Sequence, residues 1–218
     1  IKFTKKFKII YVGALKLKTS DTSLKIWKQH KKMILKNLTI VDDKKFWKKV
    51  KLKKNDQIHS LYLEIKNLIR FHIIKEISIK FKNHFIVVGD DWKKYIKNST
   101  ASNYDISYIR EIYNGNICLD FGSRWGDNAL YPRSVEIIES GGLLLQSLQP
   151  DSSMAFGNLK KFCTFKSTHD LIKKISYYQK NFSSLVSDYE KFSSYYSNNR
   201  MNYKTLSLIK RISKNNSY

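Results

Sequence analysis

The sequence predicts an α/β fold in which helices cover a mostly parallel sheet. Short apolar runs, typical of buried strands, alternate along the chain with longer segments whose apolar residues recur at helical spacing. The expected strands lie near residues 7, 38, 84, 116, 142 and 161. The segment 116–146 also carries strand, loop, helix and strand in succession, the smallest unit of a parallel sheet. We therefore expect one Rossmann-like, three-layer domain with a core at about 7–180 and C-terminal helices at 182–215.

Composition supports a folded protein with a sizeable core. The chain has 218 residues, of which 42% are hydrophobic, and it contains four Trp. No apolar run approaches the length of a membrane span, and no segment has the pattern of a signal peptide, so we expect a cytoplasmic location. Cys118 and Cys163 each fall in an expected strand, which indicates buried small hydrophobic residues rather than a disulfide or zinc site.

The net charge of +23 is concentrated in the first half of the chain. Residues 1–100 hold 26 Lys and Arg against 8 Asp and Glu, whereas residues 101–218 hold 15 against 10. Such a field attracts polyanions, and one candidate is peripheral contact of the basic residues 25–97 with an anionic membrane at its inner face. Lysine supplies most of the charge and no nucleic-acid-binding motif is present, so nucleic acid is not the expected partner. Compositional drift in a low-GC genome explains the charge equally well.

The first third of the chain predicts two strands and two helices before a long third helix. The run 7–14 is apolar and ends near Gly13, which favours a strand followed by a loop. Ser20 or Asp21 can cap a helix that continues to about Lys36. Residues 38–41 form a second short apolar run, expected to be a strand, and the lysine-rich segment 42–55 predicts an amphipathic connecting helix and a solvated loop.

Residues 58–113 predict helix, strand, turn and helix. Apolar residues recur at nearly helical period from 58 to 80. A buried strand at 85–88 follows and ends in the turn Gly89-Asp90-Asp91-Trp92. A short helix at 106–113 is expected to turn three residues inward, namely Tyr108, Ile109 and Tyr113.

The segment 116–146 organises the rest of the fold. An apolar strand at 117–121 precedes a polar loop, and Pro132 stands in the first turn of the helix expected at about 131–140. The pair Gly141-Gly142 ends that helix before the strand at 143–145. Because ligands of open α/β sheets bind outside the carboxyl ends of the strands, the loop and the first helical turn lie at the expected binding edge.

The last part of the chain predicts one more strand and several helices. A strand is expected at 161–165. Ser167, with Asp170 three residues later, indicates a helix start of the capping-box kind. Two further helices are expected at 183–198 and 203–214.

Charged residues on the helix at 131–140 make it the candidate ligand-binding element. Arg133, Glu136 and Glu139 follow one another at intervals of three residues. An arginine beside a helix N-terminus can bind phosphates, and an acidic residue one turn later can accept hydrogen bonds from ribose hydroxyls. The alternative is that Arg133 and Glu136 form an ordinary surface ion pair on one helix. The loop 122–129 adds glycines for close backbone approach, Arg124 as a second phosphate ligand, and Trp125 as a stacking surface.

The pattern R-x-x-E-x-x-x-x-G, with an apolar strand on either side, resembles the nucleotide-sugar-binding half of GT-B glycosyltransferases. In particular it is similar to the CgeB-like (spore maturation type) domain and to the glycosyl transferase family 1 type. The residues that carry the resemblance are Arg133, Val135, Glu136, Ile137, Glu139, Gly141 and the run Leu143–Leu145. Valine at 135 replaces an aromatic residue, and Glu139 replaces a small one. Weaker likeness extends to Tyr11-Val12-Gly13, to the turn ending in Trp92, and to the segment 165–178.

The resemblance implies a site for a nucleotide-sugar donor. Glu136 would hold the ribose, Arg133 and Arg124 the phosphates, and the loop 122–129 the sugar or base. The residues it implies for donor binding are Gly13, Ser123, Arg124, Trp125, Asn128, Tyr131, Arg133, Glu136, Glu139 and Gly141. No cofactor or metal is expected, because no D-x-D motif is present and positive groups can stabilise the leaving diphosphate.

The resemblance also implies a second domain that supplies the acceptor site and any general base. The sequence begins with Ile1 rather than Met, and we expect an N-terminal acceptor domain ahead of it. The acceptor stays undefined as glycan, lipid or protein. Two alternatives stay open: a non-enzymatic module that binds polyanions on a Rossmann-like fold, and an exostosin-like transferase, which shares a related arginine-and-glutamate run.

Overall fold

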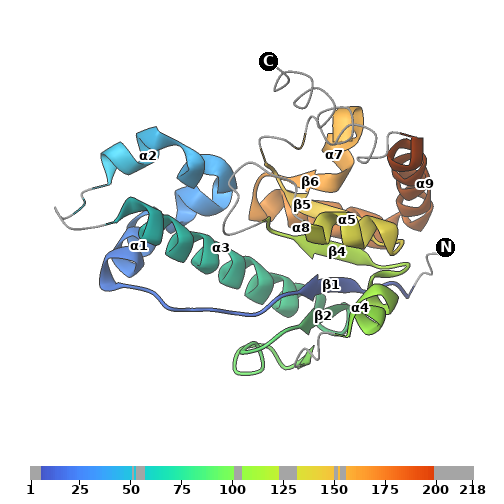
Figure 1. Cartoon of the computed structure of the whole chain (residues 1–218), viewed down its shortest axis with the longest axis horizontal. Helices are drawn as coiled ribbons and strands as arrows, with labels where there is room; N and C mark the ends of the chain where they lie inside the picture. Colours follow the sequence, from blue (N-terminus) through green and yellow to red (C-terminus); the bar gives the residue numbers. More distant parts are fainter. Residues whose placement is uncertain are drawn as a thin grey trace, which may run out of the picture.

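A six-stranded, entirely parallel sheet forms the centre of the protein (Figure 1). The computed structural model describes residues 6–50, 52, 57–100, 105–122, 132–149, 152 and 156–198. The strand order is β3-β2-β1-β4-β5-β6. The strands are β1 (Ile9–Val12), β2 (Phe85–Val88), β3 (Ser99–Thr100), β4 (Ile117–Asp120), β5 (Leu143–Ser147) and β6 (Thr164–Phe165). The α/β prediction is confirmed, and every ladder is parallel.

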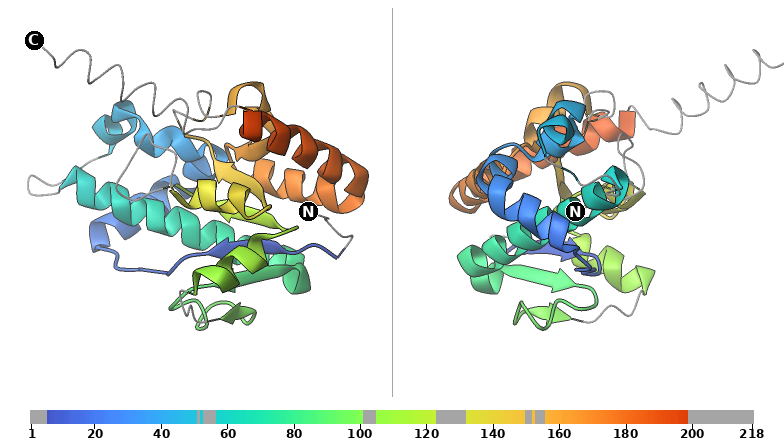
Figure 2. Two further views of the ribbon diagram at one scale, coloured as in Figure 1. Left: turned by 45° about the vertical axis from the view of Figure 1, so that its right-hand side comes forward. Right: turned by 90° about the vertical axis from the view of Figure 1, so that its left-hand side faces the viewer.

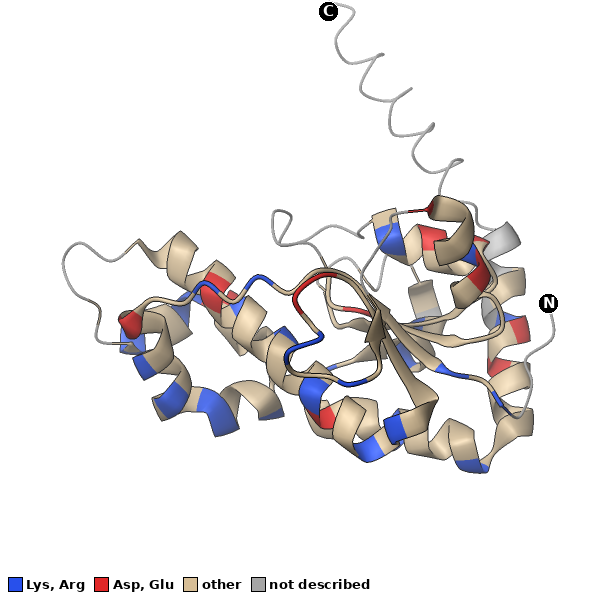
Figure 3. Ribbon diagram, turned by 90° about the horizontal axis from the view of Figure 1, so that it is seen from below, with Lys and Arg blue, Asp and Glu red and all other residues tan. Residues whose placement is uncertain are grey.

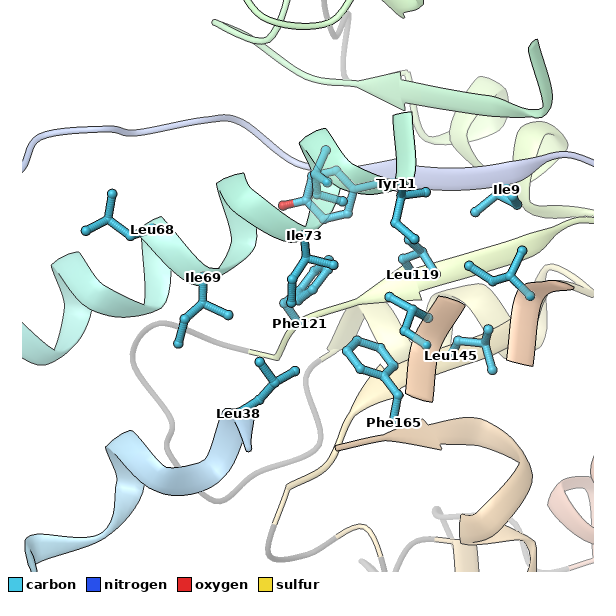
Figure 4. Close-up of a cluster of buried hydrophobic side chains, with 14 of the residues drawn as sticks. Ile9, Tyr11, Leu38, Leu68, Ile69, Ile73, Leu119, Phe121, Leu145 and Phe165 are labelled. Atoms are coloured by element: carbon cyan, nitrogen blue, oxygen red, sulfur yellow. The ribbon is translucent and has the colours of Figure 1, made fainter. Parts of the chain in front are cut away.

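Helices cover both faces of the sheet, which makes three layers. On one face α3 (Ile58–Phe81) and α8 (Thr168–Lys180) pack against alternate strand residues such as Tyr11 and Leu119. Figure 4 shows this core, in which Ile73 of α3 and Phe121 after β4 belong to one buried cluster. On the other face α4 (Ile106–Tyr113) and α5 (Pro132–Glu139) pack against the intervening residues. Burial on both faces explains why the strands are continuous apolar runs.

A helical arm lies beyond the carboxyl ends of the strands (Figure 1). It consists of α1 (Asp21–Lys36), the 3-10 helix η1 (Leu38–Asp42), α2 (Lys44–Lys49) and the first half of α3. The Ser20 cap is confirmed, because its side chain accepts from the Ser23 N–H at 3.2 Å. Ser20 also donates from its N–H and hydroxyl to Glu64 Oε2 at 2.7 and 2.8 Å, which ties the start of α1 to α3.

The strand expected at 38–41 is wrong. Asn37 caps a 3-10 helix there by accepting from the Thr39 N–H at 3.3 Å, and the Leu38 N–H donates to Lys166 O at 3.0 Å. A four-residue apolar run does not distinguish a strand from a short buried helical turn. Instead, the two-residue strand β3 pairs with the outer side of β2.

Two further expectations need correction. The segment 161–165 is not one strand: α7 (Lys160–Cys163) leads directly into β6, so Cys163 ends a helix. Tyr108 is exposed rather than turned inward, whereas Ile109 and Tyr113 are buried as expected. Both cysteines are buried and free, and burial raises the pKa of the Cys163 thiol to about 12.

The C-terminal part of the described chain is a helical hairpin. Ser167 accepts from the Asp170 N–H at 3.0 Å, which confirms the expected cap of α8. The α8 helix and α9 (Phe182–Asn198) lie side by side (Figure 2). The 3-10 helices η2 (Lys82–His84) and η3 (Gly157–Leu159) complete the described elements, and the helix expected at 203–214 lies outside the described residues. Within the described ranges no helix is both long and apolar enough to cross a bilayer.

Candidate functional site

The strand order reverses between β1 and β4, so the crevice of a doubly wound sheet is expected there. From β1 the chain moves outward to β2 and β3, then returns to place β4 on the other side of β1. This is the strand order of the Rossmann fold, whose ligands bind at the carboxyl ends of the strands beside the reversal. Gly13 follows β1 and Gly122 follows β4, so both lie at the carboxyl ends of the strands beside the reversal. We call this region the carboxyl edge.

Gly13 occupies a backbone conformation that suits glycine, with φ at 153°. Its N–H donates to Val88 O at 2.8 Å, and its carbonyl accepts from Trp92 Nε1 at 2.6 Å. Both backbone groups are therefore used inside the protein. A Cβ on this residue would lie 2.8 Å from Tyr11 Oη and 3.4 Å from Arg133 Nη1. The residue thus offers a bare α-carbon, flanked by a hydroxyl and a guanidinium, rather than a backbone donor.

Arg133 lies in the first turn of α5 beside a fully buried carboxylate. Its Nη1 is 4.0 Å from Asp120 Oδ1, and its side chain is 20% exposed. Asp120 ends β4 and accepts from the Ser134 hydroxyl at 2.5 Å and from the Gly122 N–H at 3.2 Å. These bonds fix the carboxylate, which holds the guanidinium next to Gly13 while leaving part of it open to solvent.

The other described residues of the predicted donor site differ in position. Glu136 is half-buried one turn along α5 from Arg133, and Glu139 is exposed at the end of the helix. Gly141 has φ at 81°, and its N–H donates to Ile138 O while that of Gly142 donates to Ile137 O, a Schellman motif. Thus Gly13 and Arg133 meet at the edge, whereas Gly141 and Glu139 lie at the opposite end of α5.

Three buried polar side chains on the strands and helices around this edge have no hydrogen-bond partner within the described part of the chain. They are the hydroxyls of Tyr11 and Tyr113 and the side-chain amide of Gln146. Gln146 pairs with Asp120 in the β4–β5 ladder. Burial raises the pKa of Tyr113, an effect that Arg133 opposes, so this hydroxyl interacts electrostatically with the edge. Unpaired buried polar groups are uncommon and call for an explanation.

The sequence signal for part of this cluster was present. Asp120 and Gln146 each stand near the end of an otherwise apolar strand, in ICLD and LLLQ, where a polar residue is unexpected in a buried parallel sheet. The Tyr11 hydroxyl gives no such signal, because tyrosine is common in strands. Five residues of the predicted site, Ser123, Arg124, Trp125, Asn128 and Tyr131, lie outside the described residues.

A groove and two smaller cavities lie away from this edge. A groove of about 830 Å³ runs between α7, α8 and α9, and smaller cavities of about 460 and 270 Å³ lie near η2. In the part of the chain that the structure describes, no group of three or more His, Cys, Asp or Glu side chains could hold a metal ion. The expectation of metal-independent chemistry stays a prediction.

The all-parallel sheet, its strand order and the helices on both faces place the protein in the doubly wound, Rossmann-like class of α/β proteins. Residues 70–184, more than half of the chain, match the model of a family described as glycosyl transferase-like. The chain therefore belongs to the glycosyl transferase-like family. The match includes α5 and its flanking strands. Neither a curated protein nor a solved structure matches the chain.

Proposed function

We propose that this chain is the donor-binding domain of a GT-B glycosyltransferase and binds a nucleoside diphosphate sugar at the carboxyl edge of β1 and β4. The observation that carries the proposal is the position of Arg133, which lies partly exposed beside the bare α-carbon of Gly13 at the strand reversal. Membership of the glycosyl transferase-like family supports a glycosyl transfer reaction. A closer relation to CgeB-like proteins stays a prediction.

Three described side chains would have different roles in donor binding. Arg133 at the first turn of α5 would face the diphosphate, where the helix N-terminus adds positive potential. Asp120 would keep the guanidinium in place. Glu136 would accept hydrogen bonds from the ribose hydroxyls. When the glycosidic bond to the donor breaks, negative charge grows on the leaving diphosphate, and a preorganised arginine stabilises it without a metal.

The acceptor and any general base would come from a second domain, so the described domain alone should bind donor without turnover. A family of transferases implies a sugar donor and an acceptor in general. We leave the acceptor undefined as glycan, lipid or protein, and the donor undefined in its base and sugar. We predict cytoplasmic placement of this activity.

Titration calorimetry with a panel of nucleoside diphosphates tests the proposal. We expect saturable binding of at least one member, with affinity reduced about 10-fold to 100-fold in Arg133→Ala, because a hydrogen bond to a charged group is removed. Arg110→Ala is the matched control, since Arg110 is an exposed arginine on α4. Glu136→Gln should weaken binding of the diphosphates less than Arg133→Ala does. Equal affinities for the wild type, Arg133→Ala and Arg110→Ala would contradict the assignment of the phosphate site.

The alternative function is polyanion binding by the basic arm. Exposed lysines at 25, 28, 32 and 36 follow one another along one side of α1, and Figure 3 shows the basic residues of the arm. Steep loss of single-stranded RNA binding between about 50 and 200 mM salt, together with no diphosphate binding, would favour this alternative. Contact of the segment 25–97 with an anionic membrane stays a prediction, which binding to vesicles with and without anionic lipid would test.

A further inference from the structure

The hydroxyl of Tyr11 is a buried donor without a partner in the middle of the proposed donor site. Tyr11 is fully buried in β1, and its Oη has no hydrogen-bond partner among the residues that the structure describes. A buried polar group that has lost water without gaining a partner carries a free-energy cost, whereas phenylalanine would fill the same space without it. The hydroxyl is thus not explained by the stability of the unliganded fold.

The ring of Tyr11 is held firmly, so the direction of its hydroxyl is fixed. Its ring makes edge contacts with Trp92 at 5.7 Å and with Phe121 at 5.6 Å between centroids. Trp92 is itself anchored through Nε1 to Gly13 O. Figure 4 shows the Tyr11 oxygen at the tip of the side chain, directed away from Ile9. Packing therefore preorganises this donor at the carboxyl end of β1.

The hydroxyl and Arg133 converge on one small region. A Cβ on Gly13 would lie 2.8 Å from Tyr11 Oη, 3.2 Å from its Cζ and 3.4 Å from Arg133 Nη1. The absence of a side chain at residue 13 keeps that region clear for both groups. An oxygen atom of an anionic ligand that rests against the bare α-carbon is within reach of a neutral O–H donor and a guanidinium at once.

We infer that Tyr11 donates a hydrogen bond from Oη to a phosphate oxygen of the bound nucleoside diphosphate, beside Arg133. This inference rests on the proposed function and adds a positioning residue to it. Tyr11 fixes where the diphosphate lies on the edge of β1, and Arg133 supplies the charge. Tyr113, the other buried tyrosine without a hydroxyl partner near Arg133, packs on the opposite face of the sheet. It provides a matched comparison.

The test compares Tyr11→Phe with Tyr113→Phe in diphosphate titrations and in urea unfolding. We expect Tyr11→Phe to weaken diphosphate binding about 10-fold, the effect of one hydrogen bond to a charged group. Its unfolding midpoint should equal or exceed that of the wild type, because no internal bond is lost. Tyr113→Phe should bind the diphosphate within about 2-fold of the wild type and be equally stable.

The outcomes separate this inference from the proposed function. If the wild type binds and Arg133→Ala weakens binding while Tyr11→Phe binds like the wild type, the role of Tyr11 is overturned and the donor site stands. A clear fall in the unfolding midpoint of Tyr11→Phe would also overturn it, because the hydroxyl would then have an internal partner. If the wild type binds no nucleoside diphosphate, the proposed function fails and the inference fails with it.

Discussion

The carboxyl edge at Arg133 and the groove between α8 and α9 differ in whether their polar groups have hydrogen-bond partners within the protein. In the groove, the Tyr177 hydroxyl donates to Ser184 Oγ at 3.0 Å and the Tyr178 hydroxyl to Asp188 Oδ2 at 3.2 Å. Lys174 donates to the carbonyls of Lys161 and Thr164. At the edge, by contrast, the Tyr11 hydroxyl and the Gln146 amide are buried without a hydrogen-bond partner among the described residues.

This difference distinguishes polar groups that stabilise the fold from polar groups that can bind a ligand. The groove has a volume of about 830 Å³, yet its described buried polar groups are already paired within the protein, so they contribute to the fold. The edge holds the Tyr11 hydroxyl and the Gln146 amide, which have no hydrogen-bond partner among the described residues of the unliganded chain, and such groups are available to a ligand. Unmet hydrogen-bonding capacity beside Arg133 and Gly13 therefore supports the candidate site.

The largest effect is expected from Asp120→Ala. The substitution removes a fully buried carboxylate and leaves the Ser134 hydroxyl, the Gly122 N–H and the Arg133 guanidinium without their shared acceptor. We expect a loss of about 3 kcal/mol in the free energy of unfolding. Asp188→Ala in the groove should cost about 1 kcal/mol, because it mainly removes the Tyr178 acceptor. Urea unfolding of both variants measures the contrast, and equal losses would contradict the organising role of Asp120.

Gly13→Ala should have the next largest effect. Its φ of 153° disfavours any side chain, and the new Cβ would lie 2.8 Å from Tyr11 Oη. We expect a loss of about 2 kcal/mol in unfolding free energy. Combining it with Tyr11→Phe should recover part of that loss, because the hydroxyl no longer collides with the methyl group. A double-mutant cycle measures this coupling, and strict additivity would show that the two residues do not touch.

A smaller contrast is expected among the tyrosines. Tyr178→Phe loses the bond to Asp188 and should lower the unfolding free energy by about 1 kcal/mol. Tyr177→Phe loses a bond near the surface and should cost less than Tyr178→Phe does. Tyr113→Phe removes a hydroxyl that has no described partner, so it should leave the free energy of unfolding unchanged. Denaturant unfolding of the three variants checks the order. If Tyr113→Phe were the most destabilising of them, the contrast between groove and edge would fail.

The smallest effect is expected outside both regions, at His72 of α3, which packs against α1 of the arm. Burial lowers the pKa of His72 from 6.5, and Lys31 and Lys75 lower it further. Its ring contacts Trp27 of α1, and Glu76 Oε2 lies 3.9 Å from its Nε2. Between the lowered pKa and 6.5 the unfolded chain binds more protons, so the free energy of unfolding rises with pH there and levels off above 6.5.

Unfolding measured from pH 5 to pH 7.5 checks the His72 prediction. His72→Gln should flatten the rise in stability over this range while leaving diphosphate binding unchanged. An unchanged slope would show that another group causes the pH dependence. A change in diphosphate affinity would show that the arm and the edge are coupled, which would weaken the separation of the regions.

Most of the sheet was predictable because its strands are buried on both faces. Continuous apolar runs at 9–12, 85–88, 117–119 and 143–145 are long enough to identify from residue type alone. Ser99–Thr100 was missed because a two-residue edge strand is polar and carries no periodicity. Residues 38–41 were misassigned because a local cap at Asn37 and a bond to Lys166 decide their conformation. Such tertiary contacts leave no mark in a local pattern.

The candidate site was predictable only in outline. The helix with Arg133 and Glu136 at the carboxyl edge was expected from Pro132, the glycine stop and the flanking strands. The approach of Arg133 to Gly13 joins residues 120 positions apart, and only the strand order determines it. Sequence gave no reason to link the Tyr11 hydroxyl to either residue, since that contact depends on a ring direction set by Trp92 and Phe121.

The most direct test of the central claim is a crystal structure of the protein soaked with a nucleoside diphosphate that binds in solution. The account predicts phosphate density at the carboxyl ends of β1 and β4, with Arg133 and the Tyr11 hydroxyl within hydrogen-bonding distance of phosphate oxygens. Density for the nucleotide in the groove between α8 and α9, with none at Arg133, would contradict it.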